Sequence, residues 1–161
     1  MYLGLNTLFT LIAVYTTPGF PTSEIMLIIM LIFGPAAVFP SEAWGTNGIL
    51  QLLNTTDFFA DFMVFIGVVL PPIVALIIAS VLAENPKDAF GAFAFSILLS
   101  CGVYAIVYGI GQGTSAVIYL MWVTDTALYG GIGTIIIIFM GGIVNSLFYG
   151  ALAMLITKAG L

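Results

Sequence analysis

The residues able to do chemistry are few in this chain and stand far apart. The chain has seven Asp or Glu, two Lys and one Cys among 161 residues, with neither Arg nor His. The missing His removes the usual general base, the commonest metal ligand and the usual haem ligand. The missing Arg removes the bidentate clamp for carboxylates and phosphates. These counts predict a non-enzyme with no metal site and with no cofactor other than a bound lipid.

Two groups of acids still offer a chemical hypothesis. Asp125 stands between Thr124 and Thr126 and four residues before Tyr129, which suggests, as a weaker alternative, a membrane enzyme with an outer-surface site. Asp57 and Asp61 are one helical turn apart and could hold a cation at a helix mouth. A solvated helix start, where negative charge is favoured, is the preferred explanation of that second pair.

Prolines and one amide mark a second kind of candidate site, a polar path. Pro71 and Pro72 interrupt one apolar stretch, and Gly34-Pro35 interrupts the stretch before it. Proline removes a backbone donor, and broken helices in transporters often line a substrate site. Asn145 is a strongly polar side chain in the middle of the last apolar stretch. A kink tolerated for packing, and an interhelical hydrogen bond from Asn145, are the interpretations that we favour.

The elements that must position these residues lie in lipid. The chain is 62% apolar and 6% charged, whereas a soluble domain is about 45–50% apolar and about 25% charged. Such a chain cannot coat a surface that faces water, which excludes a soluble globular protein, a disordered chain and a nucleic-acid binder. The expected partners are membrane lipids and other membrane subunits or copies of the same chain.

Apolar stretches long enough to cross about 30 Å of hydrocarbon define the domain organisation. We predict one transmembrane domain over 1–161, an all-α integral membrane protein with spans at about 24–44, 58–82, 89–111 and 129–157. Residues 1–17 are a fifth span, an interfacial helix, or half of a re-entrant pair with residues 25–39. The stretch 112–128 is predicted as an interfacial helix.

The two lysines orient this multi-pass layout, because cytoplasmic loops retain positive charge. Lys87 follows the span 58–82 and Lys158 follows the last span, so both face the cytoplasm if two spans separate them. The cell membrane is the expected location. The sequence Asn54-Thr55-Thr56 then faces outside, where Asn54 is a candidate glycosylation site.

Small residues recur at a spacing of four in three predicted spans, which favours close helix packing. The predicted packing positions are Gly67, Ala75, Ala79, Ala92, Ser96, Ser100, Gly142, Ser146 and Gly150. We therefore predict a short-loop helix bundle that serves as a non-catalytic accessory or structural subunit of a membrane complex or homo-oligomer. The alternative function is a small channel or facilitator for a neutral solute or ion.

Overall fold

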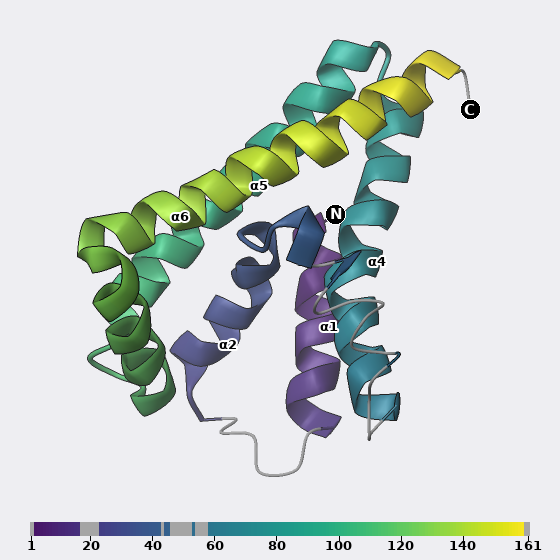
Figure 1. Cartoon of the computed structure of the whole chain (residues 1–161). Helices are drawn as coiled ribbons and strands as arrows, with labels where there is room; N and C mark the ends of the chain where they lie inside the picture. The colour runs from purple at the N-terminus through teal and green to yellow at the C-terminus, as the bar shows by residue number, and fades with distance from the viewer. Residues whose placement is uncertain (1, 17–22, 43, 46–52, 54–57, 160–161) are drawn as a thin grey trace.

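A computed structural model describes residues 2–16, 23–42, 44–45, 53 and 58–159, and only the backbone at residues 13, 16, 58–61, 63, 64, 68 and 159. In this part of the chain the longer elements are all helical, which confirms the predicted all-α class. They are α1 (Tyr2–Thr16), α2 (Ile25–Phe33), the 3-10 turn η1 (Gly34–Ala36), α4 (Phe58–Leu82), α5 (Pro86–Gly111) and α6 (Ala116–Ala159) (Figure 1).

Three of these helices are long and apolar enough to cross a membrane: α4, α5 and α6. The helices α1 and α2 are apolar but have only 15 and 9 residues. At 1.5 Å per residue, α2 is about 14 Å long and cannot cross a bilayer core by itself. The transmembrane character is thus supported by helix length and composition, while the number of spans stays a prediction.

Glycine 130 divides α6, which is otherwise too long for a single crossing. A straight helix of its 44 residues would measure about 66 Å. Gly130 has φ 74° and ψ 160°, a conformation that side-chain-bearing residues rarely adopt, and it separates residues 116–129 from residues 131–159. The predicted boundary between an interfacial helix and the last span falls within two residues of this break.

The two ends of α5 define two opposite ends of the molecule. At the Lys87 end, Asn85 caps α5 by accepting from the backbone N–H groups of Lys87 and Asp88, each at 3.1 Å. The C-terminal turn of α6, with Lys158, lies at this same end (Figure 1). At the opposite end, the Ser115 end, α5 stops and α6 begins. Both lysines therefore share one end of the molecule, while the cytoplasmic orientation stays a prediction.

The segment 24–44 is arranged differently from a continuous span. Pro35 has no backbone N–H, and the helix gives way to η1, where the N–H of Ala37 bonds to the carbonyl of Gly34 at 2.9 Å. The start of α2 lies at the Ser115 end, where Glu24 accepts a hydrogen bond from Ser115. The predicted layout expects Glu24 at the Lys87 end, and a crossing by residues 24–44 stays a prediction.

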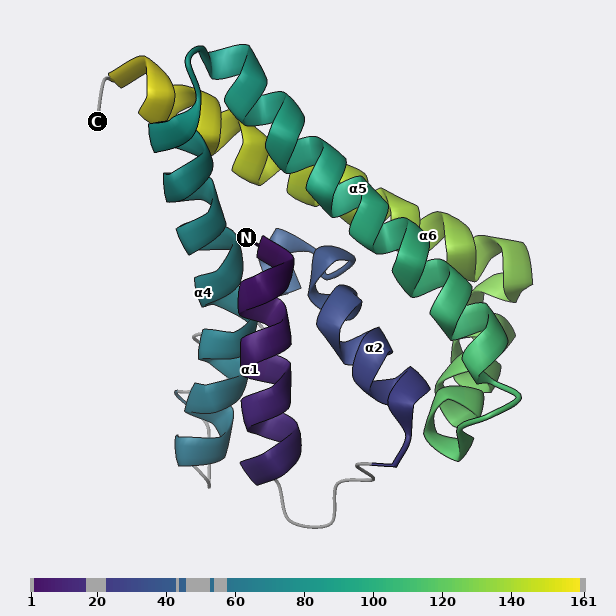
Figure 2. The ribbon, with the colours of Figure 1, turned by 180° about the vertical axis from the view of Figure 1, so that it is seen from behind.

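Two groups of helices build the fold. The helix α5 packs along α6, and α1 packs between α2 and α4 (Figures 1 and 2). The chain of α1 runs toward the Ser115 end, and α2 returns from that end toward the middle of the molecule. The core lies where η1 and the start of α1 meet α5, and it includes Ala36, Ile97, Cys101 and Tyr108, all nearly or fully buried.

Candidate functional site

The helix break at η1 lies inside the molecule and defines the candidate site. Ala36 is fully buried, and Gly34 lies against the ring of Tyr104 on α5. A break in a helix frees backbone carbonyls, and in an apolar interior each carbonyl needs a donor. The role of this break therefore depends on which donors form hydrogen bonds with its carbonyls.

Asn145 of α6 supplies donors for two of them. Its side chain is 3% exposed, and its Nδ2 donates to the carbonyls of Ala36 at 2.8 Å and Val38 at 2.6 Å. One turn earlier, Gly141 approaches the same segment, and a Cβ added there would lie 2.0 Å from the carbonyl oxygen of Ala37. The two residues therefore hold the tip of the broken helix directly against the backbone of α6.

Asn6 of α1 supplies a donor from the other side. Its Nδ2 donates to the carbonyl of Ile32 at 3.2 Å, and the side chain is 2% exposed. Its Oδ1 is buried without a hydrogen-bond partner. Tyr2, one turn before Asn6, is buried beside Phe93, with ring centroids 6.2 Å apart. The break is thus capped by two amides from different helices, and one buried acceptor remains open.

Sequence reasoning identified Asn145 but missed Asn6 and Gly141. The signal for Asn6 is a single amide within the apolar run LGLNTLF, which resembles the signal at Asn145. Gly141 was missed because only its neighbour Gly142 fits the spacing of four between small residues.

The predicted packing positions on α6 all face α5. A Cβ at Gly142 would lie 2.5 Å from the Cys101 Sγ, and one at Gly150 would lie 2.8 Å from the ring of Phe90. Ser146 donates to the carbonyl of Ala94 over a long 3.5 Å. The backbone of α6 therefore approaches α5 closely along this row.

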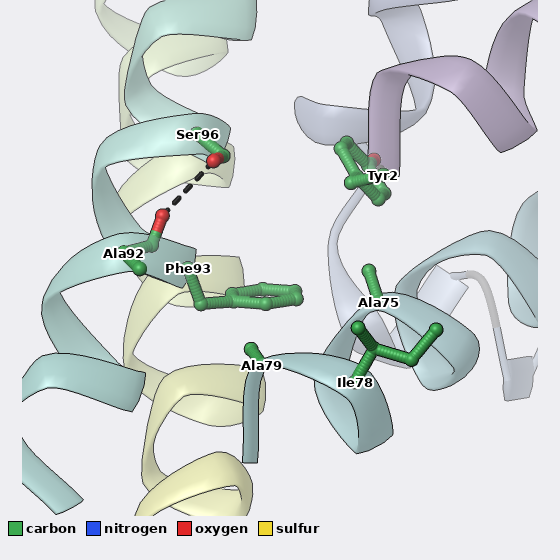
Figure 3. Close-up of a pocket in the computed structure, with 7 residues that line it drawn as sticks. All are labelled: Tyr2, Ala75, Ile78, Ala79, Ala92, Phe93 and Ser96. Atoms are coloured by element: carbon green, nitrogen blue, oxygen red, sulfur yellow. Dashed lines mark hydrogen bonds between the residues drawn. The ribbon is translucent and has the colours of Figure 1, made fainter. Parts of the chain in front are cut away.

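The small residues of α4 and the first half of α5 lie across a hollow. Ala75 and Ala79 of α4 face Ala92 and Ser96 of α5, and Tyr2, Ile78 and Phe93 complete a cavity of about 140 Å³ (Figure 3). Ser96 donates to the carbonyl of Ala92, and Ser100 donates to that of Ser96, so both hydroxyl groups bond within α5. At Gly67 an added Cβ would meet no atom within 4 Å.

Pro71, Pro72 and Asp61 belong to α4. Pro71 and Pro72 lie inside α4 and are buried, with the helix continuing on both sides. Asp61 lies in the first turns of α4, with only its backbone described, and Asn54 and Asp57 fall outside the described residues.

Polar side chains also join α4 to α6 near the Lys87 end. Ser80 donates to the carbonyl of Ala153 at 3.1 Å, and Thr157 donates to the carbonyl of Ser80 at 3.3 Å. One turn before Ala153 in α6, the Tyr149 hydroxyl accepts a hydrogen bond from the Trp44 indole at 2.9 Å. These bonds link segments that are far apart in the sequence.

The group around Asp125 does not converge into a catalytic arrangement. Asp125 accepts a hydrogen bond from the Tyr108 hydroxyl at 2.5 Å. Thr124 and Thr126 donate to carbonyls of their own helix, and Tyr129 is exposed. Asp125 therefore ties the first part of α6 to α5. Within the described residues no group of three or more His, Cys, Asp or Glu could hold a metal ion.

A comparison of this chain with protein-family models, with curated proteins and with solved structures finds no match.

Proposed function

We propose that the chain is a non-catalytic membrane subunit that assembles with other membrane chains or with copies of itself. This proposal rests on one observation: the chain itself buries only a small part of the three helices that could cross a membrane. Only 35%, 33% and 22% of the most apolar windows of α4, α5 and α6 are buried inside the chain. After Gly130, α6 exposes Ile132, Ile136, Ile143 and Leu147, four residues at helical spacing.

The use of the interior polar groups supports the same function. Asn145, Asn6 and Ser80 each donate to a backbone carbonyl of another helix. Such bonds hold helices together in an apolar solvent, where each contributes about 0.6 kcal/mol on average. Polar side chains engaged in this way support a scaffold rather than a catalyst.

We also propose that α1 and α2 form a re-entrant pair that enters the membrane from the Ser115 end. Both helices are shorter than a bilayer core, and non-helical backbone is tolerated at that depth only when protein or a water-filled cavity surrounds it. The carbonyls of Ile32, Ala36 and Val38 meet this requirement through the two asparagines.

Mass measurement in mild detergent tests the assembly proposal. The expected result is a particle whose protein mass exceeds 17.1 kDa, through a second copy or a co-purifying chain. A strict monomer from native membranes, with no accompanying chain, contradicts it. A matched variant, Ile136→Ser with Ile143→Ser, should weaken the assembly, whereas the same changes at Ile77 and Val81 on α4 should not if α6 provides the interface.

A facilitator of a small neutral solute is the second candidate function. The unpartnered Oδ1 of Asn6 favours it, since a buried acceptor can receive a hydrogen bond from a passing donor. Flux into liposomes that Asn145→Leu and Asn6→Leu both abolish would support transport. Absence of flux across a broad panel of neutral solutes leaves the subunit proposal ahead.

A further inference from the structure

A hollow of about 380 Å³ opens at the Ser115 end of the molecule, apart from the helix break. It is lined by Ser23, Glu24, Ile25 and Met26 at the start of α2, and by Thr114 and Ser115 just before α6. Its volume lies within the range of small-molecule sites, about 300–1,000 Å³. Two segments more than 85 residues apart in the sequence therefore build one polar depression.

The carboxylate of Glu24 is the charged group of this hollow, and its position is fixed. The Ser115 hydroxyl donates to Glu24 Oε2, and the Ser115 Oγ accepts from the N–H of Ile118 at 3.3 Å. Ser115 is 4% exposed. A buried hydroxyl that caps α6 therefore orients the carboxylate, while Glu24 itself stays half-buried at the edge of the hollow.

No positive side chain of this protein offsets that charge. The chain has only two basic side chains, Lys87 and Lys158, and both stand at the other end of the molecule. Lys87 lies in the first turn of α5, and the 24 residues from Asp88 to Gly111 separate it from the other end of that helix, a distance of about 36 Å. The hollow is thus complementary to a positive charge that must come from outside the chain.

The other polar groups of the hollow favour a ligand rich in donors. The Thr114 hydroxyl donates to the carbonyl of Gly111 at 3.1 Å, which leaves its oxygen free to accept. Ser23 adds an exposed hydroxyl. A primary ammonium group has three N–H donors and no acceptor, so one carboxylate and two hydroxyl oxygens match it. Ile25 and Met26 add an apolar wall for a short alkyl chain.

A metal ion fits this set of groups less well. Calcium takes six to eight oxygen ligands, usually with several carboxylates, whereas a single carboxylate lines this hollow.

We propose that this hollow binds a primary ammonium group on a short alkyl chain, with Glu24 as the ionic partner. Two sources share this chemistry: a free amine such as ethanolamine, and the headgroup of an ethanolamine phospholipid at the membrane surface. The site stands independently of the assembly proposed above, because no lining residue belongs to the exposed face of residues 131–159.

Calorimetric titration of the full chain in detergent with ethanolamine tests the charge and the hydrogen bonds. Glu24→Gln should weaken binding at least tenfold, and Thr114→Val should weaken it severalfold. Glu84→Gln is the matched control, because Glu84 is an exposed carboxylate at the Lys87 end. Choline should bind at least tenfold more weakly than ethanolamine, because its quaternary nitrogen has no N–H to donate.

Nanodiscs containing equal amounts of phosphatidylethanolamine and phosphatidylcholine separate the two sources. Retention of phosphatidylethanolamine by the wild type, lost in Glu24→Gln, together with weak binding of free ethanolamine, assigns the site to the lipid headgroup. Tight binding of free ethanolamine without a lipid preference assigns it to a soluble amine.

If Glu24→Gln unfolds, Glu24→Asp keeps the charge and should retain binding within a few fold. Equal binding of choline and ethanolamine, unchanged binding in Glu24→Gln, or no binding in either format overturns the proposal.

Discussion

The contact between Gly141 and the tip of the broken helix predicts a large and specific effect of a single methyl group. In Gly141→Ala the new Cβ would lie 2.0 Å from the carbonyl oxygen of Ala37 and 2.9 Å from its carbonyl carbon. Both atoms belong to backbone, so no side chain can rotate away. The helix and η1 must separate by more than 1 Å to restore an ordinary contact.

The magnitude follows from two opposing effects. Replacing glycine by alanine within a helix gains about 1 kcal/mol of helix propensity. Forcing an extra methyl group into a packed interior costs about 1–3 kcal/mol, and a contact between two backbones belongs at the upper end. Separation of the two segments also stretches the bonds from Asn145, one turn away. We expect Gly141→Ala to lower the free energy of unfolding by about 2 kcal/mol or more.

Gly102→Ala is the matched control, since an added Cβ at Gly102 in α5 meets nothing within 4 Å. That variant should be as stable as the wild type or slightly more stable. The assay is unfolding of the purified protein in mixed micelles, by titration with dodecyl sulfate and detection by far-UV circular dichroism. A gap of about 3 kcal/mol between the two variants corresponds to more than a hundredfold in the unfolding equilibrium. Equal midpoints for Gly141→Ala and Gly102→Ala would refute the close contact of η1 with α6.

Three further substitutions are checked by the same unfolding titration. Asn145→Leu leaves two buried carbonyls without a donor and should cost about 1–3 kcal/mol; an unchanged midpoint would contradict the cap. Gly130→Ala must hold alanine at φ 74° and ψ 160° and should cost about 1–3 kcal/mol, whereas Gly131→Ala should cost less. Tyr108→Phe loses a bond to a carboxylate and should cost about 1.5–3 kcal/mol, in contrast to the exposed Tyr119→Phe.

The sequence predicts the long helices well because lipid imposes a simple length rule. The stretches 58–82 and 89–111 coincide with α4 and most of α5, and α4 continues through Pro71 and Pro72. The short helices α1 and α2 are harder to assign, because about 15 apolar residues fit a tilted span, an interfacial helix or a re-entrant helix equally well. The contact between Glu24 and Ser115 supports the re-entrant arrangement proposed above, and no local pattern in the sequence predicts that contact.

The candidate site shows the same division between local and tertiary information. Asn145 is recognisable from its sequence because an amide within an apolar span needs a partner. The identity of that partner, the backbone carbonyls of Ala36 and Val38, depends on where η1 docks. The small residues of α4 illustrate the limit: their spacing predicts close approach, yet Ala75 and Ala79 border a hollow (Figure 3). Spacing identifies a face that allows approach, and the partner helix decides whether approach occurs.

The path of the segment 24–44 leads to a prediction about membrane sidedness. If this segment crosses the membrane, Ser23 must lie on the same side as Asn85, because two crossings then separate them. In the structure, Glu24 contacts Ser115, and the length of α5 separates Ser115 from Asn85. We therefore expect Ser23 and Thr114 to face one side of the membrane and Asn85 to face the other.

Single cysteines at these three positions allow the test in a Cys101→Ala background, since Cys101 is the chain's single cysteine and is buried. In sealed right-side-out vesicles, a membrane-impermeant maleimide should label Ser23→Cys and Thr114→Cys to a similar extent. Asn85→Cys should react only after the vesicles are opened, and inverted vesicles should reverse the pattern. Joint labelling of Ser23→Cys with Asn85→Cys would mean that residues 24–44 cross the membrane. In that event Glu24 and Ser115 could not be in contact, which would refute both the re-entrant pair and the ammonium site. The hydrogen bonds from Asn145 would still be tested separately by Asn145→Leu.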